Sequence, residues 1–287
     1  GHRRQAADDL QACHLHTGAH EAAQGRRNRI SDTKRRRRDF RRLFCDVSIK
    51  IHRKADPMSI AENVAAIRAQ IDRAAIAAGR DPKEILLCAA TKMNGSDAVR
   101  QAIAAGVDCC GENRVQELLA HYEEVDHTVE WHFIGTLQKN KVKYIVDKVD
   151  MIQSLDSEGL ALEIDKRAGK IGKIMPVLIE VNIGREENKS GVFEEQLEEL
   201  LCQIAELESI SVKGLMTIPP ICDNTRKIKK YFNNMHKLFI DISQKKLDNI
   251  SMTILSMGMS ADYYEAILEG ANMIRVGSAL FGARNYT

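Results

Sequence analysis

Residues 85–92 read ILLCAATK, six apolar side chains followed by Thr91 and Lys92. A short, continuously apolar run such as 85–90 is typical of a strand in a parallel sheet, because helices cover both faces of such a sheet. Seven similar runs follow along the chain, at 107–110, 131–134, 151–154, 176–181, 212–216, 252–255 and 273–276. We therefore predict eight buried strands.

Amphipathic segments separate these runs, near 96–105, 114–124, 138–147, 157–170, 193–206, 225–246 and 260–269. Another helix is predicted ahead of the first run, because Ser59 and Glu62 match a capping box and an apolar stripe follows them up to Gly79. Alternating helices and strands indicate a parallel sheet. Eight repeats in about 250 residues favour a single closed (β/α)8 barrel of the TIM type, with an open, doubly wound sheet as the alternative.

The first 57 residues differ in composition from the rest. Residues 1–57 hold 15 of the 42 basic residues, 7 of the 40 acidic residues and five of the nine histidines, and they include the run KRRRR at 34–38. A basic arm that binds nucleic acid is one interpretation, and a mitochondrial transit peptide is another. We favour a disordered or non-native leader over 1–57, followed by one barrel domain over 58–287.

The composition is that of a soluble globular protein, with 44% hydrophobic and 29% charged residues and a mean hydropathy of −0.31. No apolar run approaches the roughly 20 residues that span a bilayer, and the pattern of a signal peptide is missing. We expect a cytoplasmic protein without membrane contact. None of the seven cysteines forms a C-x-x-C pair. We therefore predict neither a disulfide framework nor a metal site, but reduced thiols.

A (β/α)8 barrel places its active site at the C-terminal ends of its strands, and Lys92 follows the first strand. Burial of a lysine favours the neutral amine, the form that attacks an aldehyde. The alternative is a lysine that reaches solvent at the barrel rim.

Two glycine-containing turns lie at the ends of the last two predicted strands. Gly277 and Ser278 follow the eighth strand and open a helical segment, where free N–H groups favour a phosphate. Ser256, Met257 and Gly258 at the end of the seventh strand complete the predicted phosphate site. Alternatively, both are tight turns that need glycine for backbone freedom.

Other polar residues of the predicted barrel allow two interpretations each. Arg275 in the last strand faces either a cofactor ring nitrogen or an acid such as Glu180 or Glu112, since a buried guanidinium needs a partner. His132 either stacks on a flat ring or is a hydrogen-bonded core histidine. Asn113 and Asn182 are polar contacts or turn formers.

Seven motifs, taken in order, resemble one family. They are Thr91-Lys92, Gly111-Glu112-Asn113-x-x-Gln116-Glu117, His132-Phe133-Ile134-Gly135-x-Leu137-Gln138-x-Asn140-Lys141, Lys189-Ser190-Gly191, Gly214-Leu215-Met216, Ser256-Met257-Gly258-Met259-Ser260-x-Asp262 and Arg275-x-Gly277-x-x-x-Phe281-Gly282. The set resembles the pyridoxal phosphate homeostasis proteins, barrels of PLP fold type III that bind pyridoxal 5′-phosphate (PLP) and are related to the N-terminal domain of alanine racemase. The similarity covers about 59–285.

The resemblance implies a role for each candidate residue. It makes Lys92 the Schiff-base lysine, sets Arg275 against the pyridine nitrogen and places the phosphate among Ser256, Met257, Gly277 and Ser278. Asn113 and His132 complete the expected cofactor-binding set.

The resemblance also implies a function in intracellular PLP (vitamin B6) homeostasis without an established reaction. The expected protein is a monomer whose partners are PLP and PLP-dependent apo-enzymes, not nucleic acid. A slow PLP-dependent amino-acid racemase or lyase is the alternative.

Two departures from related proteins bear on this expectation. Cys110 stands where the family usually has Phe, so a packing contact near the second strand is expected to be lost. The sequence given ends at Thr287, just after the predicted barrel, without the second β-domain that supplies the tyrosine base in alanine racemase. We therefore expect a PLP carrier or regulator with no catalytic residues.

Overall fold

A computed structural model describes residues 58–245 and 247–282. The chain divides into two units, residues 1–57 and residues 58–287. The interpretations of residues 1–57 lie outside the described residues and stay predictions.

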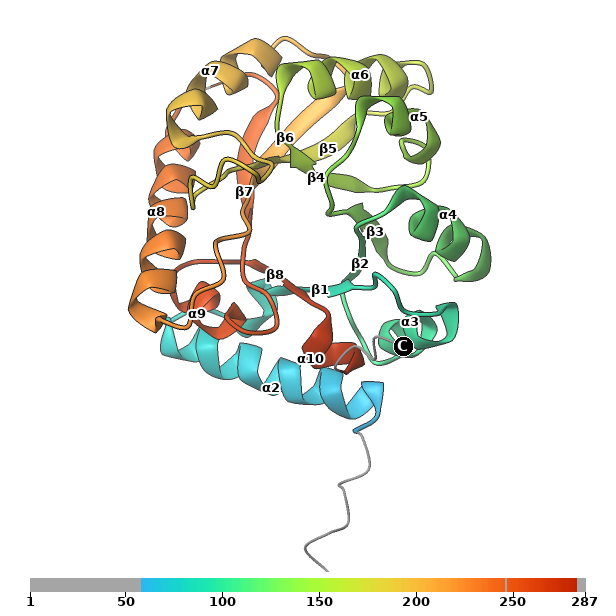
Figure 1. Cartoon of the computed structure of the whole chain (residues 1–287), viewed down its shortest axis with the longest axis vertical. Helices are drawn as coiled ribbons and strands as arrows, with labels where there is room; N and C mark the ends of the chain where they lie inside the picture. Colours follow the sequence, from blue (N-terminus) through green and yellow to red (C-terminus); the bar gives the residue numbers. More distant parts are fainter. Residues whose placement is uncertain (1–57, 246, 283–287) are drawn as a thin grey trace, which may run out of the picture. The chain divides into compact units, whose positions relative to one another are not determined.

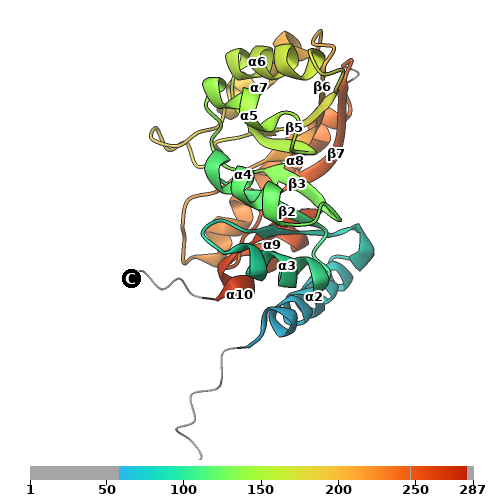
Figure 2. The same cartoon turned by 90° about the vertical axis from the view of Figure 1, so that its right-hand side faces the viewer.

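Eight parallel strands close into one barrel in the order β1-β2-β3-β4-β5-β6-β7-β8, with β8 paired to β1 (Figures 1 and 2). The strands are β1 (Leu86–Ala90), β2 (Cys109–Glu112), β3 (Glu130–Phe133), β4 (Met151–Leu155), β5 (Met175–Glu180), β6 (Ile210–Met216), β7 (Ile250–Ser256) and β8 (Met273–Val276). All eight predicted strands are confirmed. The open, doubly wound alternative is wrong, because the pairing of β1 with β8 leaves the sheet without an edge.

Helices follow the strands and form an outer ring around the barrel (Figure 1). They are α2 (Ile60–Ala77), α3 (Ser96–Ala104), α4 (Val115–Glu124), α5 (Val142–Ile145), α6 (Glu158–Gly169), α7 (Glu194–Ile204), α8 (Thr225–Ser243), α9 (Tyr263–Leu268) and α10 (Ser278–Phe281), with 3-10 turns η1 (Pro82–Glu84) and η2 (Lys139–Lys141). The predicted capping box opens α2: the Ser59 N–H donates to Glu62 Oε2 at 2.8 Å, and the Glu62 N–H donates to Ser59 Oγ at 3.2 Å. The segment predicted near 138–147 is shorter than expected, because η2 occupies its first turn.

The strands carry different side chains on their two faces, because successive residues of a strand point in opposite directions. One face packs against the helices and includes large buried residues such as Trp131, Phe133 and Ile152. Inside the barrel, Cys88, Cys109 and Met273 form one small apolar cluster, and Met151, Leu178 and Met216 form a second. The interior is therefore a packed core, with polar side chains at defined places.

Gly214 shows how closely two neighbouring strands approach. Its φ is +153°, and a Cβ at this position would lie 1.8 Å from the carbonyl oxygen of Ile254 in β7. The register of β6 against β7 shifts between Val212 and Gly214. A residue without a side chain is therefore required at this irregularity.

No helix of the described part of the chain has the length and apolar character needed to cross a membrane.

Candidate functional site

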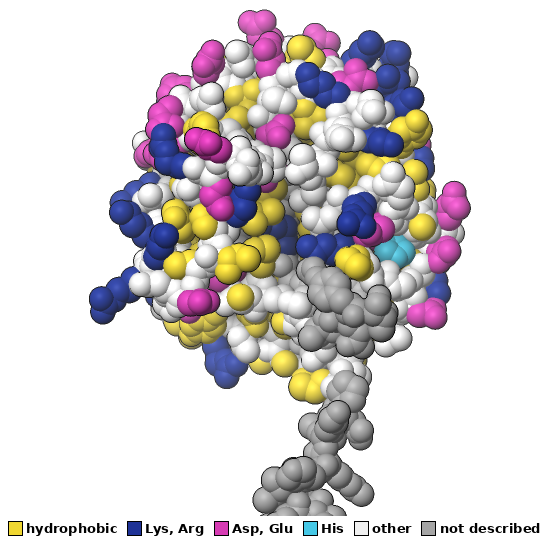
Figure 3. Space-filling model, in the orientation of Figure 1, with side chains coloured by type: hydrophobic (Ala, Val, Ile, Leu, Met, Phe, Trp, Pro, Cys, Tyr) yellow, Lys and Arg dark blue, Asp and Glu magenta, His cyan; other side chains and the backbone are white. Residues whose placement is uncertain are grey.

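The carboxyl ends of the eight strands form the face that is turned toward the viewer in Figure 1. Candidate residues reach this face directly after their strands: Lys92 after β1, Asn113 after β2, Met257 after β7, and Gly277 and Ser278 after β8. A space-filling view in the same orientation shows Lys and Arg side chains near the centre of the face (Figure 3). The barrel therefore brings together residues that are far apart in the sequence, in a basic setting that suits an anionic ligand.

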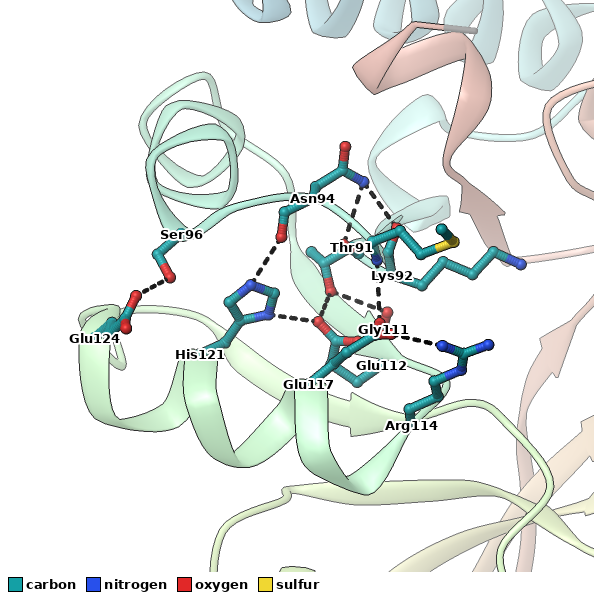
Figure 4. A network of polar contacts seen from close by, with 11 residues as sticks. Thr91, Lys92, Asn94, Ser96, Gly111, Glu112, Arg114, Glu117, His121 and Glu124 are labelled. Atoms are coloured by element: carbon teal, nitrogen blue, oxygen red, sulfur yellow. Dashed lines mark hydrogen bonds and ion pairs between the residues drawn. The ribbon is translucent and has the colours of Figure 1, made fainter. Parts of the chain in front are cut away.

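Lys92 lies in the turn between β1 and α3, and its neighbours anchor this turn to β2 (Figure 4). Thr91 is fully buried; its N–H donates to the Gly111 carbonyl at 3.0 Å, and its hydroxyl donates to the Glu112 carboxylate. On the other side of Lys92, the Met93 N–H donates to Glu117 Oε2 at 3.0 Å. Contacts on both sides thus hold the backbone at Lys92, whose half-buried side chain extends away from Glu112 in Figure 4.

His121 of α4 supports the same carboxylate from the opposite side. Its Nδ1 lies 2.7 Å from Glu112 Oε1, and its Nε2 lies 2.9 Å from the Asn94 carbonyl oxygen. Both partners are acceptors, so both ring nitrogens donate when the imidazole is protonated. The hydrogen bond to Glu112 accordingly raises the pKa of His121, and the Asn94 carbonyl acts in the same direction. The turn at Lys92 therefore depends on the buried contact between Glu112 and His121, which is an ion pair when His121 is protonated.

Sequence analysis did not identify this supporting role. Glu112 and Glu117 belong to one of the seven motifs, and the sequence suggests Glu112 only as a partner for Arg275. His121 belongs to none of the seven motifs, because both of its partners are distant in the sequence. Glu112 precedes it by nine residues and Asn94 by 27. A histidine on the helix face that packs against a buried acid was the available signal.

Arg275 lies inside the barrel with 3% of its surface exposed. Its Nη1 donates to Ser256 Oγ at 2.6 Å, and its Nη2 donates to the Thr217 carbonyl at 2.7 Å. Burial lowers its pKa, because removal of water disfavours the charged form. The guanidinium is therefore held by neutral oxygens.

The predicted alternative, an ion pair between Arg275 and Glu180 or Glu112, is wrong. Glu112 binds Thr91 and His121 instead. Glu180 accepts a hydrogen bond from Ser190 Oγ at 3.0 Å, and burial raises the pKa of its carboxyl. The charge of Arg275 thus remains available to a ligand.

His132 is a hydrogen-bonded core histidine, which was one of the two interpretations of this residue. It is fully buried in β3, and its Nδ1 lies 2.9 Å from Gln153 Nε2 while its Nε2 lies 3.0 Å from Glu130 Oε2. Gln153 Oε1 in turn accepts from Ser256 Oγ at 2.7 Å. Gln153 thus links His132 and Ser256, two predicted site residues. The sequence did not predict this role, although a polar amide within the apolar run 151–154 could have indicated it.

The two predicted phosphate turns differ in how their polar groups are used. The Ser256 hydroxyl donates to Gln153 Oε1 and accepts from Arg275 Nη1. Near the end of β8, the N–H groups of Gly277 and Ala279 donate to Ser260 Oγ at 3.3 and 3.1 Å. Ser260 therefore orders the turn that Gly277 begins, a role that sequence analysis did not assign.

Several features fit a bound anionic cofactor. A Cβ at Gly277 would lie 3.2 Å from the Ala90 carbonyl oxygen, so glycine brings the β8 turn close to the strand that precedes Lys92. Asn113 Oδ1 is buried and has no hydrogen-bond partner in the described part of the chain, so it can accept a hydrogen bond from a ligand. With Arg275 and Lys92 at the same end of the barrel, the residues suit a phosphate ester that carries an aldehyde.

Comparison with known sequences identifies relatives over most of the chain. The sequence model of the family described as alanine racemase, N-terminal domain, matches residues 61–285. The pyridoxal phosphate homeostasis protein of Aquifex aeolicus is 44% identical over 230 residues, which are 80% of this chain and all of that protein. The protein of the same name from Escherichia coli K12 is 37% identical over 234 residues, which are 79% of this chain and 98% of that protein.

Solved structures have the same fold. PipY of Synechococcus elongatus with PLP bound is 34% identical, with a TM-score of 0.69 over 78% of this chain and all of that chain. A protein of unknown function from Bifidobacterium adolescentis is 34% identical, with a TM-score of 0.75 over 77% of this chain and 94% of that chain. Alanine racemase of Clostridium difficile is 17% identical with a TM-score of 0.62, and the match covers 78% of this chain and 57% of the racemase. This last similarity concerns the fold alone.

We predict that the contribution of His121 to stability depends on pH. Its raised pKa means that the folded protein holds the proton more tightly than the unfolded chain does. The stabilisation is therefore complete below the unfolded pKa of about 6.5 and is lost as the pH rises through the higher folded pKa. The difference in free energy of unfolding between wild type and His121→Asn, measured by chemical denaturation, is expected to be largest below the unfolded pKa and to shrink as the pH rises above it.

The control for this prediction is His127→Asn. His127 is exposed, and its Nε2 lies 2.9 Å from the Tyr122 carbonyl oxygen, away from Glu112. This substitution leaves Glu112 and His121 in contact, so the pH dependence assigned to that contact is expected to remain. A His121→Asn effect that stays constant across the pH range would contradict the ion pair.

Proposed function

We propose, from the premise that this chain belongs to the pyridoxal phosphate homeostasis proteins of the alanine racemase N-terminal domain family, that it holds PLP as a Schiff base on Lys92. The observation that carries the proposal is the anchored turn, in which Thr91 and Met93 fix the backbone on both sides of a half-buried lysine. The cofactor is PLP. The role is to hold and release PLP within intracellular vitamin B6 balance.

The residues around Lys92 have complementary proposed roles. The neutral amine of Lys92 forms a carbon–nitrogen double bond with the aldehyde and one water molecule leaves, so hydrolysis by water at the barrel mouth reverses the step. Arg275 faces the pyridine nitrogen, while the turns at Ser256–Met257 and Gly277–Ser278 hold the phosphate. Asn113 accepts a hydrogen bond from the bound group, and His132 positions Ser256 through Gln153.

Arg275 also favours a non-enzymatic role. A buried cation beside the pyridine nitrogen disfavours protonation of the ring, because two neighbouring positive charges repel each other. An unprotonated ring stabilises negative charge on a bound amino acid poorly. The two oxygens that hold Arg275 are neutral, so no carboxylate among its hydrogen-bond partners offsets its charge. We therefore favour a PLP carrier or regulator over a slow racemase or lyase.

We predict that borohydride reduction of the PLP-loaded protein fixes PLP on one peptide, which contains Lys92. Lys92→Ala is expected to abolish this product, because the amine that forms the double bond is removed. Peptide mass spectrometry measures the product. The control is Lys189→Ala, which removes an exposed lysine that pairs with Glu186. Fixation on another lysine, or full fixation in Lys92→Ala, would refute the assignment.

We predict that amino acids are not turned over. Arg275 limits stabilisation of the α-carbanion, so the α-proton of L-amino acids is expected to exchange with D₂O far more slowly than about 1 s⁻¹. Proton NMR of the PLP-loaded protein with a panel of L-amino acids measures this rate. Exchange at about 1 s⁻¹ or faster would favour the alternative of a racemase or lyase, whereas PLP transfer to an apo-enzyme without exchange supports a carrier.

We propose that residues 58–287 form the PLP-binding domain and that residues 1–57 do not take part in binding. The family match begins at residue 61, and the Aquifex relative aligns over its whole length with 80% of this chain. A chain that begins at Met58 is expected to give the same borohydride product and thermal midpoint as the full chain. A large loss of either would contradict this boundary.

The remaining expectations concern the cell. PLP-dependent apo-enzymes are the proposed partners, because PLP held by a reversible bond needs an acceptor. The protein is proposed to be a monomer that does not bind nucleic acid. The cytoplasm is the proposed location, which agrees with free thiols at Cys88, Cys109, Cys110, Cys202 and Cys222.

A further inference from the structure

Two cysteines and a histidine meet inside the barrel, below the proposed cofactor site. We propose that Cys88, Cys109 and His132 bind a thiophilic divalent cation of the Zn²⁺ type. Each residue offers one ligand atom, these atoms lie within 4.8 Å of one another, and all three residues are buried. Sequence analysis predicted no metal site, because these residues have no recognisable spacing along the chain.

The parallel register explains why the three side chains meet. Cys88 of β1 pairs with Cys109 of β2, and His132 of β3 pairs with Gly111 of β2. Inward-facing residues of adjacent strands therefore stand side by side. Gly111 keeps the space between them open, because a Cβ at this position would lie 2.8 Å from Cys88 Sγ.

The donor set suits a tetrahedral cation. Two thiolates and an imidazole are ligands that Zn²⁺ takes in proteins, and bonds of about 2.0–2.3 Å place its ligand atoms about 3.3–3.8 Å apart. Two ligand atoms that are 4.8 Å apart enter this range when they move less than about 1.5 Å closer together. The cluster thus needs only side-chain adjustment.

Glu130 supplies the next donor. Its carboxylate lies 3.0 Å from His132 Nε2, and its side chain is 67% exposed, so it can rotate. When the cation takes Nε2, Glu130 is close enough to become the fourth ligand. With the cation on Nε2 the ring proton lies on Nδ1, so the Gln153 amide, whose Nε2 faces Nδ1 at 2.9 Å, turns to present its Oε1 as the acceptor.

The surrounding charges support binding of a cation. Two thiolates and the Glu130 carboxylate together carry three negative charges, which is one more than a divalent cation neutralises. Arg275 pairs with Cys88 in the register of β1 and β8 and faces the same interior. Its positive charge on the neighbouring strand lowers the cost of burying the negatively charged ligand set.

A polar cleft lies at the end of the barrel opposite Lys92. The cleft has a volume of about 340 Å³ and includes Glu130, Asp147 and Asp150 in its lining. Glu130 begins β3 and Asp150 precedes β4, so the cleft lies at the amino-terminal ends of the strands. Lys148 and Lys173 line the cleft beside these acids, and Glu130, the proposed fourth ligand, borders it.

The test uses Co²⁺ as a spectroscopic probe, because Co²⁺ bound by thiolates gives an intense charge-transfer absorption and takes the same ligands as Zn²⁺. The reduced full-length protein is titrated with Co²⁺, and Zn²⁺ is then added to displace it. We expect one thiolate-bound Co²⁺ per chain. In Cys88→Ala and Cys109→Ala the affinity for Co²⁺ is expected to fall by about 100-fold or more. Loss of a metal ligand costs at least as much affinity as loss of a group that hydrogen-bonds to a ligand.

Cys110→Ala is the matched control, because Cys110 is adjacent to Cys109 and equally buried but packs in the core outside the barrel. It is expected to keep the absorption. The five histidines of residues 1–57 are present in every variant, so the difference between variants reports the barrel site alone. Circular dichroism checks that each variant is folded.

Three results would overturn the proposal. One is the absence of the absorption in the reduced wild type, and another is its persistence in the Cys88→Ala, Cys109→Ala double variant. The third is a disulfide between Cys88 and Cys109 in protein purified without oxidant, detected as a mass two hydrogens lower. None of these measurements depends on PLP, so they are independent of the function proposed for Lys92.

Discussion

The buried carboxylate of Glu112 is the constraint on which the geometry at Lys92 depends. It accepts a hydrogen bond from Thr91, next to the lysine, and it pairs with His121 from the neighbouring helix. A buried carboxylate without such partners would cost several kcal/mol, so the fold and this turn stabilise each other. The backbone at Lys92 is thus ordered during folding and has little freedom left to lose when a ligand binds.

A second constraint comes from the polar groups inside the barrel. Arg275, Ser256, Gln153 and His132 follow one another in a line of hydrogen bonds, so each buried polar side chain satisfies the next. This line runs from the strands that carry the proposed phosphate turns to the strands that carry the proposed metal ligands. The two proposed sites therefore share one hydrogen-bonded framework.

The pattern of apolar runs was enough to predict the fold. Each of the eight runs became a strand, because strands of a sheet covered by helices are mostly apolar. Lys92, Asn113, Met257 and Gly277 were found by their position directly after these runs. Side chains within the strands were harder to interpret, since an inward position shows only that a polar group needs a partner. Thus Arg275 and His132 each kept two interpretations.

Local order along the chain determined the elements, their alternation and the end of the barrel that carries Lys92. The partners of buried polar groups were decided only by the tertiary structure. Glu112 could have paired with Arg275, but its position on the outer face of β2 turns it toward His121. Cys88 and Cys109 are 21 residues apart, and only the register of β1 against β2 makes them neighbours. The physical reason is that hydrophobic periodicity is a property of one segment, whereas a hydrogen bond, an ion pair or a metal site depends on the register between segments.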